Sequence, residues 1–210
     1  MSVNTDPEMM LKMANSLTDL VGVCKLETTA DSSSSRPVVE RESFELKSYC
    51  NEMALSQTQR AQIFGMFETN MKAQYEQNWG WKEDKMRNEV FHPMSRYLCL
   101  YPKDNEDELA GYVIFRFEWD DDEEPEYPVL YCYQLMVSAE KQRHGLGRHL
   151  MSLLSTIGKK LRMEKVMLTV FNSNTESVEF YKRIGFAVDE NSPSTCGFPA
   201  EYEILSKVPK

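Results

Sequence analysis

Gln142-Arg143-His144-Gly145-Leu146-Gly147 follows an apolar segment that ends at Val137 and precedes residues 150–161, where leucine and isoleucine recur at helical spacing. We therefore expect a strand, a turn and a helix in that order. Gly145 and Gly147 carry no Cβ atom, so the backbone of the turn can approach a ligand closely. Unpaired N–H groups in the first turn of a helix attract phosphate oxygens, and Arg143 and Arg148 add positive charge. Two glycines alone favour an ordinary tight turn, so the surrounding sequence has to decide.

The sequence after this turn alternates between helical and strand patterns. Helices are expected over residues 145–161 and 173–184, with a strand over residues 166–171 between them. Two short strands, over residues 186–189 and 202–205, are expected to follow. This order is typical of a sheet that carries helices on both faces.

The sequence before the turn is richer in strands. Residues 97–101, 111–119 and 129–137 are rich in aromatic and β-branched side chains and are separated by polar turns, which predicts an antiparallel meander. An earlier strand is expected over residues 44–49, and Ser56 is a good N-cap for a long helix that runs toward Trp79. We predict an α/β (α+β) fold with a mixed, mostly antiparallel central sheet flanked by helices.

Residues 1–42 are expected to form an N-terminal helix and a serine-rich linker, and residues 43–208 a single globular domain. The helix is predicted over residues 7–20. Its apolar stripe is expected to pack on the domain and consists of Met9, Met10, Met13, Leu17 and Leu20. Residues 28–36 include four consecutive serines and bury too little apolar surface to offset the entropy of ordering, so we expect a mobile linker there.

The composition restricts the class of partner. The chain has 210 residues, of which 41% are hydrophobic and 27% charged, with a formal net charge of −9. This charge disfavours a broad nucleic-acid-binding surface and favours a basic ligand. The five cysteines are scattered and odd in number, so we expect neither a disulfide scaffold nor a metal site. Without a signal-peptide pattern or a long apolar run, we expect no membrane attachment and a location in the cytoplasm and nucleus.

The turn at residues 142–147 resembles the Gln/Arg-x-x-Gly-x-Gly/Ala signature of the GNAT superfamily of acetyl-CoA-dependent N-acetyltransferases. Two later segments, in the order that this superfamily uses, add to the resemblance. They are Val166-Met167-Leu168-Thr169-Val170 and Phe180-Tyr181-Lys182-Arg183-Ile184-Gly185-Phe186. The resemblance implies a GNAT fold and acetyl-CoA as the cosubstrate.

A narrower resemblance, over residues 43–206, is to the NatD group of amino-terminal acetyltransferases. It rests on four segments: residues 75–82 (YEQNWGWK), 130–133 (LYCY), 165–171 (KVMLTVF) and 202–206 (YEILS). It implies acetylation of the free α-amine of core histones that begin Ser-Gly-Arg-Gly, without an auxiliary subunit, and we expect a monomer. The alternatives are an acetyltransferase for lysine side chains or polyamines, and a GNAT-fold module that binds histone tails with little catalysis.

The resemblance also implies roles for individual residues. The acetyl-CoA site would comprise Met136, Val137, Ser138, Gln142, Arg143, His144, Gly145, Leu146, Gly147, Arg148, His149, Thr169 and Asn174. Backbone N–H groups just after the strand can hold the thioester oxygen as charge develops on it. The peptide pocket would comprise Tyr75, Trp79, Glu118, Tyr131, Tyr133 and Tyr202, although aromatic side chains in strands are usually core.

Glu118 lies where the family carries an aspartate that receives the substrate arginine. It begins an acidic run, Asp120, Asp121, Asp122, Glu123, Glu124 and Glu126, which is typical of a solvated loop. Such a loop beside the pocket would also raise the local concentration of a basic histone tail. No direct contact with nucleic acid is expected.

Tyr131, Tyr133 and Gln134 are the catalytic candidates, and Gln134 departs from the family pattern. The family has a glutamate at this position that draws a proton from the amine through water, whereas an amide is no base near neutral pH. Either another group or water takes the proton, or this form turns over slowly or has been altered to hold its substrate. Glu203 and Glu76 are conceivable replacements, but nothing in the sequence places either beside the amine.

Overall fold

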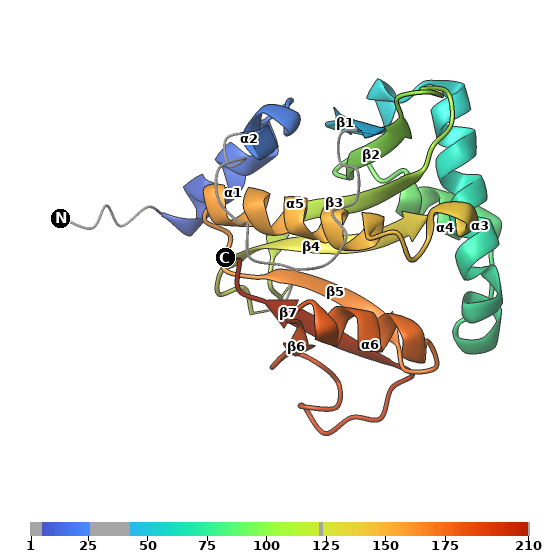
Figure 1. The fold of residues 1–210 in the computed structure, drawn as a ribbon. Helices are drawn as coiled ribbons and strands as arrows, with labels where there is room; N and C mark the ends of the chain where they lie inside the picture. The colour runs from blue at the N-terminus through green and yellow to red at the C-terminus, as the bar shows by residue number, and fades with distance from the viewer. Residues whose placement is uncertain (1–5, 26–42, 122–123, 210) are drawn as a thin grey trace.

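The computed structural model describes residues 6–25, 43–121 and 124–209. Within these residues the chain forms a seven-stranded sheet in the order β1-β2-β3-β4-β5-β7-β6 (Figure 1). Its strands are β1 (Phe44–Tyr49), β2 (Arg96–Pro102), β3 (Gly111–Trp119), β4 (Pro128–Val137), β5 (Val166–Phe171), β6 (Ala187–Val188) and β7 (Tyr202–Lys207). Only the β4–β5 pair is parallel. The predicted meander and the mixed, mostly antiparallel sheet are confirmed.

Helices cover both faces of this sheet. The helices are α1 (Pro7–Ser16), α2 (Val21–Lys25), α3 (Gln57–Asn78), α4 (Glu83–Val90), α5 (Leu146–Lys160) and α6 (Thr175–Arg183). Alternate residues of β3 point to opposite faces, as the period of two requires. Val113 and Phe115 pack with α1 and α5 in one hydrophobic cluster, whereas Tyr112 and Ile114 pack with α3 and α4 in the other.

Local signals explain where the long helices begin. Ser56 caps α3 in a capping box, because its hydroxyl accepts from the N–H of Gln59 while the Gln59 side chain accepts from the N–H of Ser56. The N-cap of α5 is Gly145, with φ at 88° in the left-handed region that favours glycine. Asn174 caps α6 by accepting from the N–H of Ser177. The predicted Ser56 cap is confirmed.

The N-terminal helix differs from its prediction. It ends at Ser16 instead of residue 20, and Met9 and Met13 are exposed whereas Leu20 is buried. The guanidinium of Arg96 donates to the backbone oxygens of Asn15 and Leu17, which holds the end of α1 on the sheet. These hydrogen bonds to backbone carbonyl groups help to orient the helix. The spacing of apolar residues in the sequence does not reveal them. The linker predicted over residues 28–36 lies outside the described residues.

Helix α4 was not predicted, because its sequence Glu-Asp-Lys-Met-Arg-Asn-Glu-Val is almost wholly polar. Met86 and Val90 are its buried residues, one turn apart, and they join the cluster beneath α3. Glu83 and Asp84 in the first turn and Arg87 in the last turn suit the helix dipole. Hydrogen bonds from Tyr97 and Arg116 of the sheet to the backbone oxygens of Val90 and Glu89 also hold the end of this short helix.

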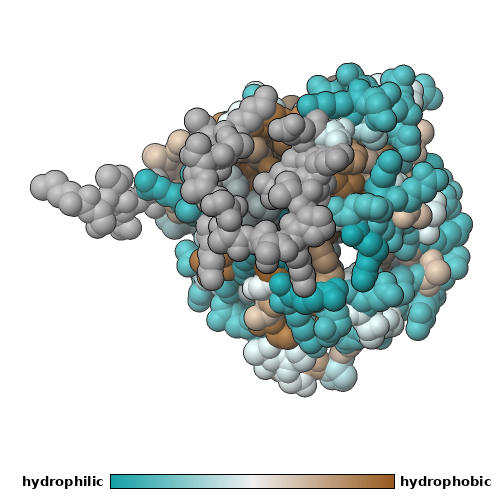
Figure 2. Space-filling view, viewed as in Figure 1, coloured by the Kyte–Doolittle hydropathy of each residue, from teal (hydrophilic) through white to brown (hydrophobic). Residues whose placement is uncertain are grey.

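Hydrophilic side chains dominate the described surface at the edge of the molecule formed by α3 (Figure 2). Within the parts of the chain that the structure describes, no helix has the length and apolar character needed to cross a bilayer.

Candidate active site

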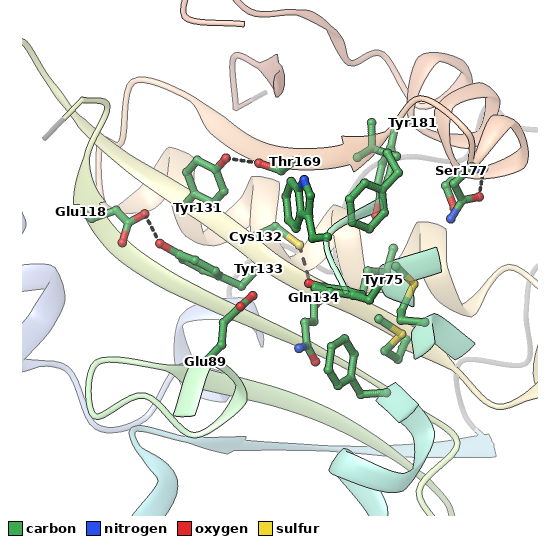
Figure 3. Close-up of a pocket in the computed structure, with 18 of the residues that line it drawn as sticks. Tyr75, Glu89, Glu118, Tyr131, Cys132, Tyr133, Gln134, Thr169, Ser177 and Tyr181 are labelled. Atoms are coloured by element: carbon green, nitrogen blue, oxygen red, sulfur yellow. Dashed lines mark hydrogen bonds between the residues drawn. The ribbon is translucent and has the colours of Figure 1, made fainter. Parts of the chain in front are cut away.

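Strands β4 and β5 pair only near their beginnings, and a cavity opens where they separate. Their pairing runs from Leu130 with Val166 to Cys132 with Leu168, while β5 stays paired with β7 as far as Phe171. The cavity has a volume of about 620 Å³ and reaches from α3 and α4 on one face to α6 on the other (Figure 3). Because the lost strand pairing leaves backbone groups of β4 facing the cavity, this gap is suited to hold an extended ligand.

A β-bulge in β4 shapes the centre of the cavity. Ile114 pairs with Gln134 and Phe115 with Cys132, so Tyr133 is the extra residue on β4. Tyr133 packs with the cluster under α3, and Gln134 bonds to Tyr112 of that same cluster. The bulge therefore turns two consecutive side chains, Tyr133 and Gln134, toward the same face.

Gln134 is buried, with 4% of its surface exposed. Its Oε1 lies 3.0 Å from the hydroxyl of Tyr112, which also lies 3.1 Å from the backbone oxygen of Ile63. The hydroxyl has one proton and can donate to only one of these acceptors at a time. Among the described residues, Nε2 of Gln134 has no hydrogen-bond partner. The Gln134 amide thus retains an unused donor beside the cavity.

The tyrosines of β4 are held by hydrogen bonds. The Tyr133 hydroxyl donates to Oε1 of Glu118 at 2.8 Å, and the Tyr131 hydroxyl shares a hydrogen bond with Oγ1 of Thr169 at 2.6 Å. Burial raises the pKa of Tyr131 to about 12 and raises the pKa of Tyr133 further, with Glu118 adding to the shift. Both phenols are therefore protonated near neutral pH and do not act as bases.

Acidic side chains surround one end of the cavity. Glu118, Asp120 and Asp121 line it from the end of β3, and Glu89 lines it from α4. Arg116 is the neighbouring cation, and its guanidinium carbon lies 3.8 Å from the centre of the Tyr133 ring. This end of the cavity suits a cationic substrate. Glu89 was missed by sequence reasoning, because the helix that carries it was missed.

The turn before α5 combines two residues with positive φ, Arg143 at 65° and Gly145 at 88°. No acceptor within the described parts of the chain binds the backbone N–H groups of residues 143–148. Such a run of unpaired N–H groups at a helix start forms a concave anion site. Nδ1 of His144 lies 2.7 Å from the backbone oxygen of Gln142, so this ring nitrogen forms a hydrogen bond within the turn.

The structure brings the turn and the cavity close together. A Cβ atom at Gly147 would lie 3.5 Å from Cζ of Phe180 on α6 and 3.8 Å from Cδ2 of Leu135, and Leu135 lines the cavity. Val137 and Ser138 link β4 to the turn, and the N–H of Ser138 donates to the oxygen of Ala110. Gln142 and Arg143 precede α5 and are exposed. Arg148 and His149 lie in its first turn and are exposed or partly buried, whereas Leu146 is part of the core.

Nearly all of the predicted substrate and catalytic residues line the cavity, together with three of the predicted cofactor residues. They are Tyr75, Trp79, Glu118, Tyr131, Tyr133, Gln134, Met136, Thr169 and Asn174. Tyr202 lies outside the lining, with its ring centre 5.5 Å from that of Trp79. Ser177 and Tyr181 of α6 line the cavity but were not predicted as site residues. Tyr181 belongs to the Phe-Tyr segment near the end of α6, a signal that the sequence did contain.

The described residues contain no cluster of three histidine, cysteine, aspartate or glutamate side chains suited to a metal ion. Cys132 lines the cavity as a free thiol, and burial raises its pKa to about 12. It is therefore an uncharged, weak nucleophile near neutral pH.

Comparisons with known proteins agree with this geometry. The acetyltransferase (GNAT) family model matches residues 61–186. The fold resembles that of Tetrahymena GCN5, at 13% identity over 79% of this chain and 96% of that one, with a TM-score of 0.58. It also resembles Arabidopsis thaliana NAA60, at 13% identity over 78% and 98% of the chains with a TM-score of 0.55. Arabidopsis thaliana Naa50, in complex with the bisubstrate analogue CoA-Ac-MVNAL, matches at 17% identity over 79% and 98%, with a TM-score of 0.51.

Proposed function

This chain belongs to the acetyltransferase (GNAT) family, whose members use acetyl-CoA, and we propose that it acetylates the α-amine of proteins that begin Ser-Gly-Arg-Gly, as core histones do. The observation that carries this proposal is the acidic end of the cavity, where Glu118 is held by the Tyr133 hydroxyl at 2.8 Å. The resemblance of residues 43–206 to NatD supplies the identity of the tail.

The residues present fit acetyl-CoA. The unpaired N–H groups of residues 143–148 would hold its pyrophosphate, and the edge of β4 beyond Cys132 would hold its pantetheine amides and thioester. When bound, acetyl-CoA supplies the activated acetyl group. Burial keeps the Tyr181 phenol protonated by raising its pKa, so that this hydroxyl can donate a hydrogen bond to a leaving group in the cavity.

The acceptor would enter from the acidic end of the cavity. The amino terminus would lie among the aromatic side chains of Tyr75, Trp79 and Tyr133, and the arginine at the third position would pair with Glu118. The acidic run after Glu118 would steer a basic tail toward the opening in a salt-dependent manner. We extend the proposal to an enzyme that works as a monomer in the cytoplasm and nucleus.

Four peptides test this function. The purified protein is incubated with acetyl-CoA and Ser-Gly-Arg-Gly-Lys, its amino-terminally blocked form, a Ser-Gly-Ala-Gly-Lys variant, or an unrelated lysine-containing peptide. Mass spectrometry of fragments locates the acetyl group. We expect acetylation of the α-amine of the first peptide and little reaction with the other three. Acetylation of lysine in the blocked peptide would favour a lysine acetyltransferase, and tail binding without turnover would favour a binding module.

A further inference from the structure

Glu89 places a carboxyl group at the acceptor end of the cavity. It lies in the last turn of α4, and Figure 3 shows its carboxylate pointing into the cavity toward Tyr133. The guanidinium of Arg116 connects the two residues, because Nη2 donates to the backbone oxygen of Glu89 at 3.0 Å while the guanidinium carbon lies 3.8 Å from the Tyr133 ring centre. No described residue donates a hydrogen bond to the Glu89 carboxylate, so it is available to a ligand.

The protein environment of Glu89 favours the protonated carboxyl group more than an aqueous environment would. Burial raises its pKa above the ordinary glutamate value, and the positive charges of Arg116 and Lys85 only partly oppose this shift. Tyr75 on α3 also interacts electrostatically with Glu89, Tyr133 on β4 and Glu118 on β3 line the same cavity, and His92 follows α4 in the chain. A carboxylate whose pKa is moved toward neutrality is a stronger base than an exposed one.

The other candidates for the role of base are occupied or unsuited. Tyr75, Tyr131 and Tyr133 are protonated phenols near neutral pH, because burial raises each pKa. Glu203 accepts from the hydroxyls of Ser192 and Ser194, and Glu76 is exposed and absent from the cavity lining. Glu118 accepts from Tyr133, and Asp120 and Asp121 accept from backbone N–H groups of their own loop. Gln134 is an amide and cannot take a proton near neutral pH.

We propose that Glu89 on α4 accepts a proton from the substrate ammonium group. It would act as the base because position 134 carries an amide instead of a carboxylate. This inference rests on the proposed function. One ammonium proton passes to the Glu89 carboxylate, and the neutral nitrogen then forms a bond to the acetyl carbon. The carbon–sulfur bond breaks, the remaining surplus proton of the nitrogen goes to the thiolate through solvent or Tyr181, and Glu89 later releases its proton to water. The products are the acetylated amide and CoA thiol.

The pH dependence of Glu89→Gln tests this role. With a base, the parent enzyme can use the ammonium form, so kcat/KM should stay nearly constant as pH falls from 8.5 to 6.5. Without a base, the variant depends on the neutral α-amine, whose pKa is about 7.7–8.0. The ratio of parent to variant kcat/KM should therefore be larger at pH 6.5 than at pH 8.5 by about tenfold or more. Loss of positioning alone would lower activity by the same factor at both pH values.

Asp84→Asn is the matched control, because it removes a carboxylate from the exposed side of the same helix. It should keep the parent profile. Acetyl-CoA affinity, measured by calorimetry, and thermal unfolding should be unchanged in Glu89→Gln, which separates a chemical effect from misfolding. A parallel pH profile for Glu89→Gln and the parent would overturn the proposal for Glu89 alone. Absence of α-amine acetylation in the parent enzyme would instead refute the proposed function.

Discussion

The hydroxyl of Tyr133 on β4 donates a hydrogen bond to Oε1 of Glu118 on the adjacent strand β3, at 2.8 Å. Tyr133 occupies the bulge of β4, and Glu118 lies near the end of β3. The bond fixes the direction of a carboxylate at the opening of the cavity. The bulge in β4 thus places Tyr133 where it can hold the negatively charged side chain of Glu118.

Glu118→Gln should lower kcat/KM for Ser-Gly-Arg-Gly while keeping an acceptor for Tyr133. A charge-assisted hydrogen bond contributes about 1.5–3 kcal/mol, which corresponds to roughly 10- to 150-fold in catalytic efficiency. The same substitution should change kcat/KM for Ser-Gly-Ala-Gly by much less, because no guanidinium is present. A double-mutant cycle across enzyme and peptide measures this coupling. Equal losses on both peptides would mean that Glu118 does not contact the arginine.

Gly145→Ala should weaken acetyl-CoA binding, because the φ of 88° at this position strains any residue with a Cβ atom. Distortion of the turn would misalign the N–H groups of residues 143–148. Gly65→Ala is the matched control: it lies in α3 with open space around its Cβ position, and should stabilise the protein by about 0.5–1 kcal/mol without changing affinity. Calorimetric titration with acetyl-CoA checks both variants, and unchanged affinity in Gly145→Ala would exclude the turn as the phosphate site.

Gln134→Glu should rescue Glu89→Gln. A glutamate at position 134 can accept a hydrogen bond from Tyr112 as the amide does, and it lines the same cavity. In the double variant, activity at pH 6.5 should recover relative to activity at pH 8.5, because a carboxylate is again available as a base. The pH–rate profiles of the parent, single and double variants provide the comparison. A double variant with the profile of Glu89→Gln would show that proton removal is not what Glu89 contributes.

Cys132→Ala should retain turnover within about threefold, since its thiol, with a pKa of about 12, is not an activated nucleophile. Rapid quenching followed by intact-protein mass spectrometry should show no acetyl-enzyme in the absence of peptide. Accumulation of an acetylated protein on Cys132, together with loss of activity in the variant, would argue for a covalent intermediate instead of direct attack.

The parts of the fold that follow from hydrophobic periodicity were predictable. Strands β3 and β5 occur over the expected residues, and α3 begins at the expected Ser56 cap. Helix α4 was not predictable in this way because only two of its side chains, Met86 and Val90, are buried. Met9 and Met13 are exposed, and Arg96 binds the end of α1 from a strand that is distant in the sequence, which the apolar pattern does not reveal.

The candidate site also has features that the sequence predicts and features that it does not. The glycine turn and the tyrosines of β4 carry motif signals that the sequence displays directly. The separation of β4 from β5 and the bulge at Tyr133 depend on hydrogen-bond register between strands, which residue types do not reveal. Glu89 became a candidate only when its helix placed it in the lining of the same cavity as Gln134, since a lone glutamate in a polar segment carries no signal.

The central claim is that one cavity holds acetyl-CoA and a free Ser-Gly-Arg-Gly terminus with their reacting atoms together. The most direct measurement is the affinity of a bisubstrate analogue in which CoA is joined through an acetyl group to the α-nitrogen of that peptide. We expect calorimetry to show binding about 10²–10⁴-fold tighter than binding of acetyl-CoA, because the two parts are held at high effective concentration. An affinity no greater than that of acetyl-CoA, or equal to that of an analogue joined through a lysine side chain, would contradict the claim.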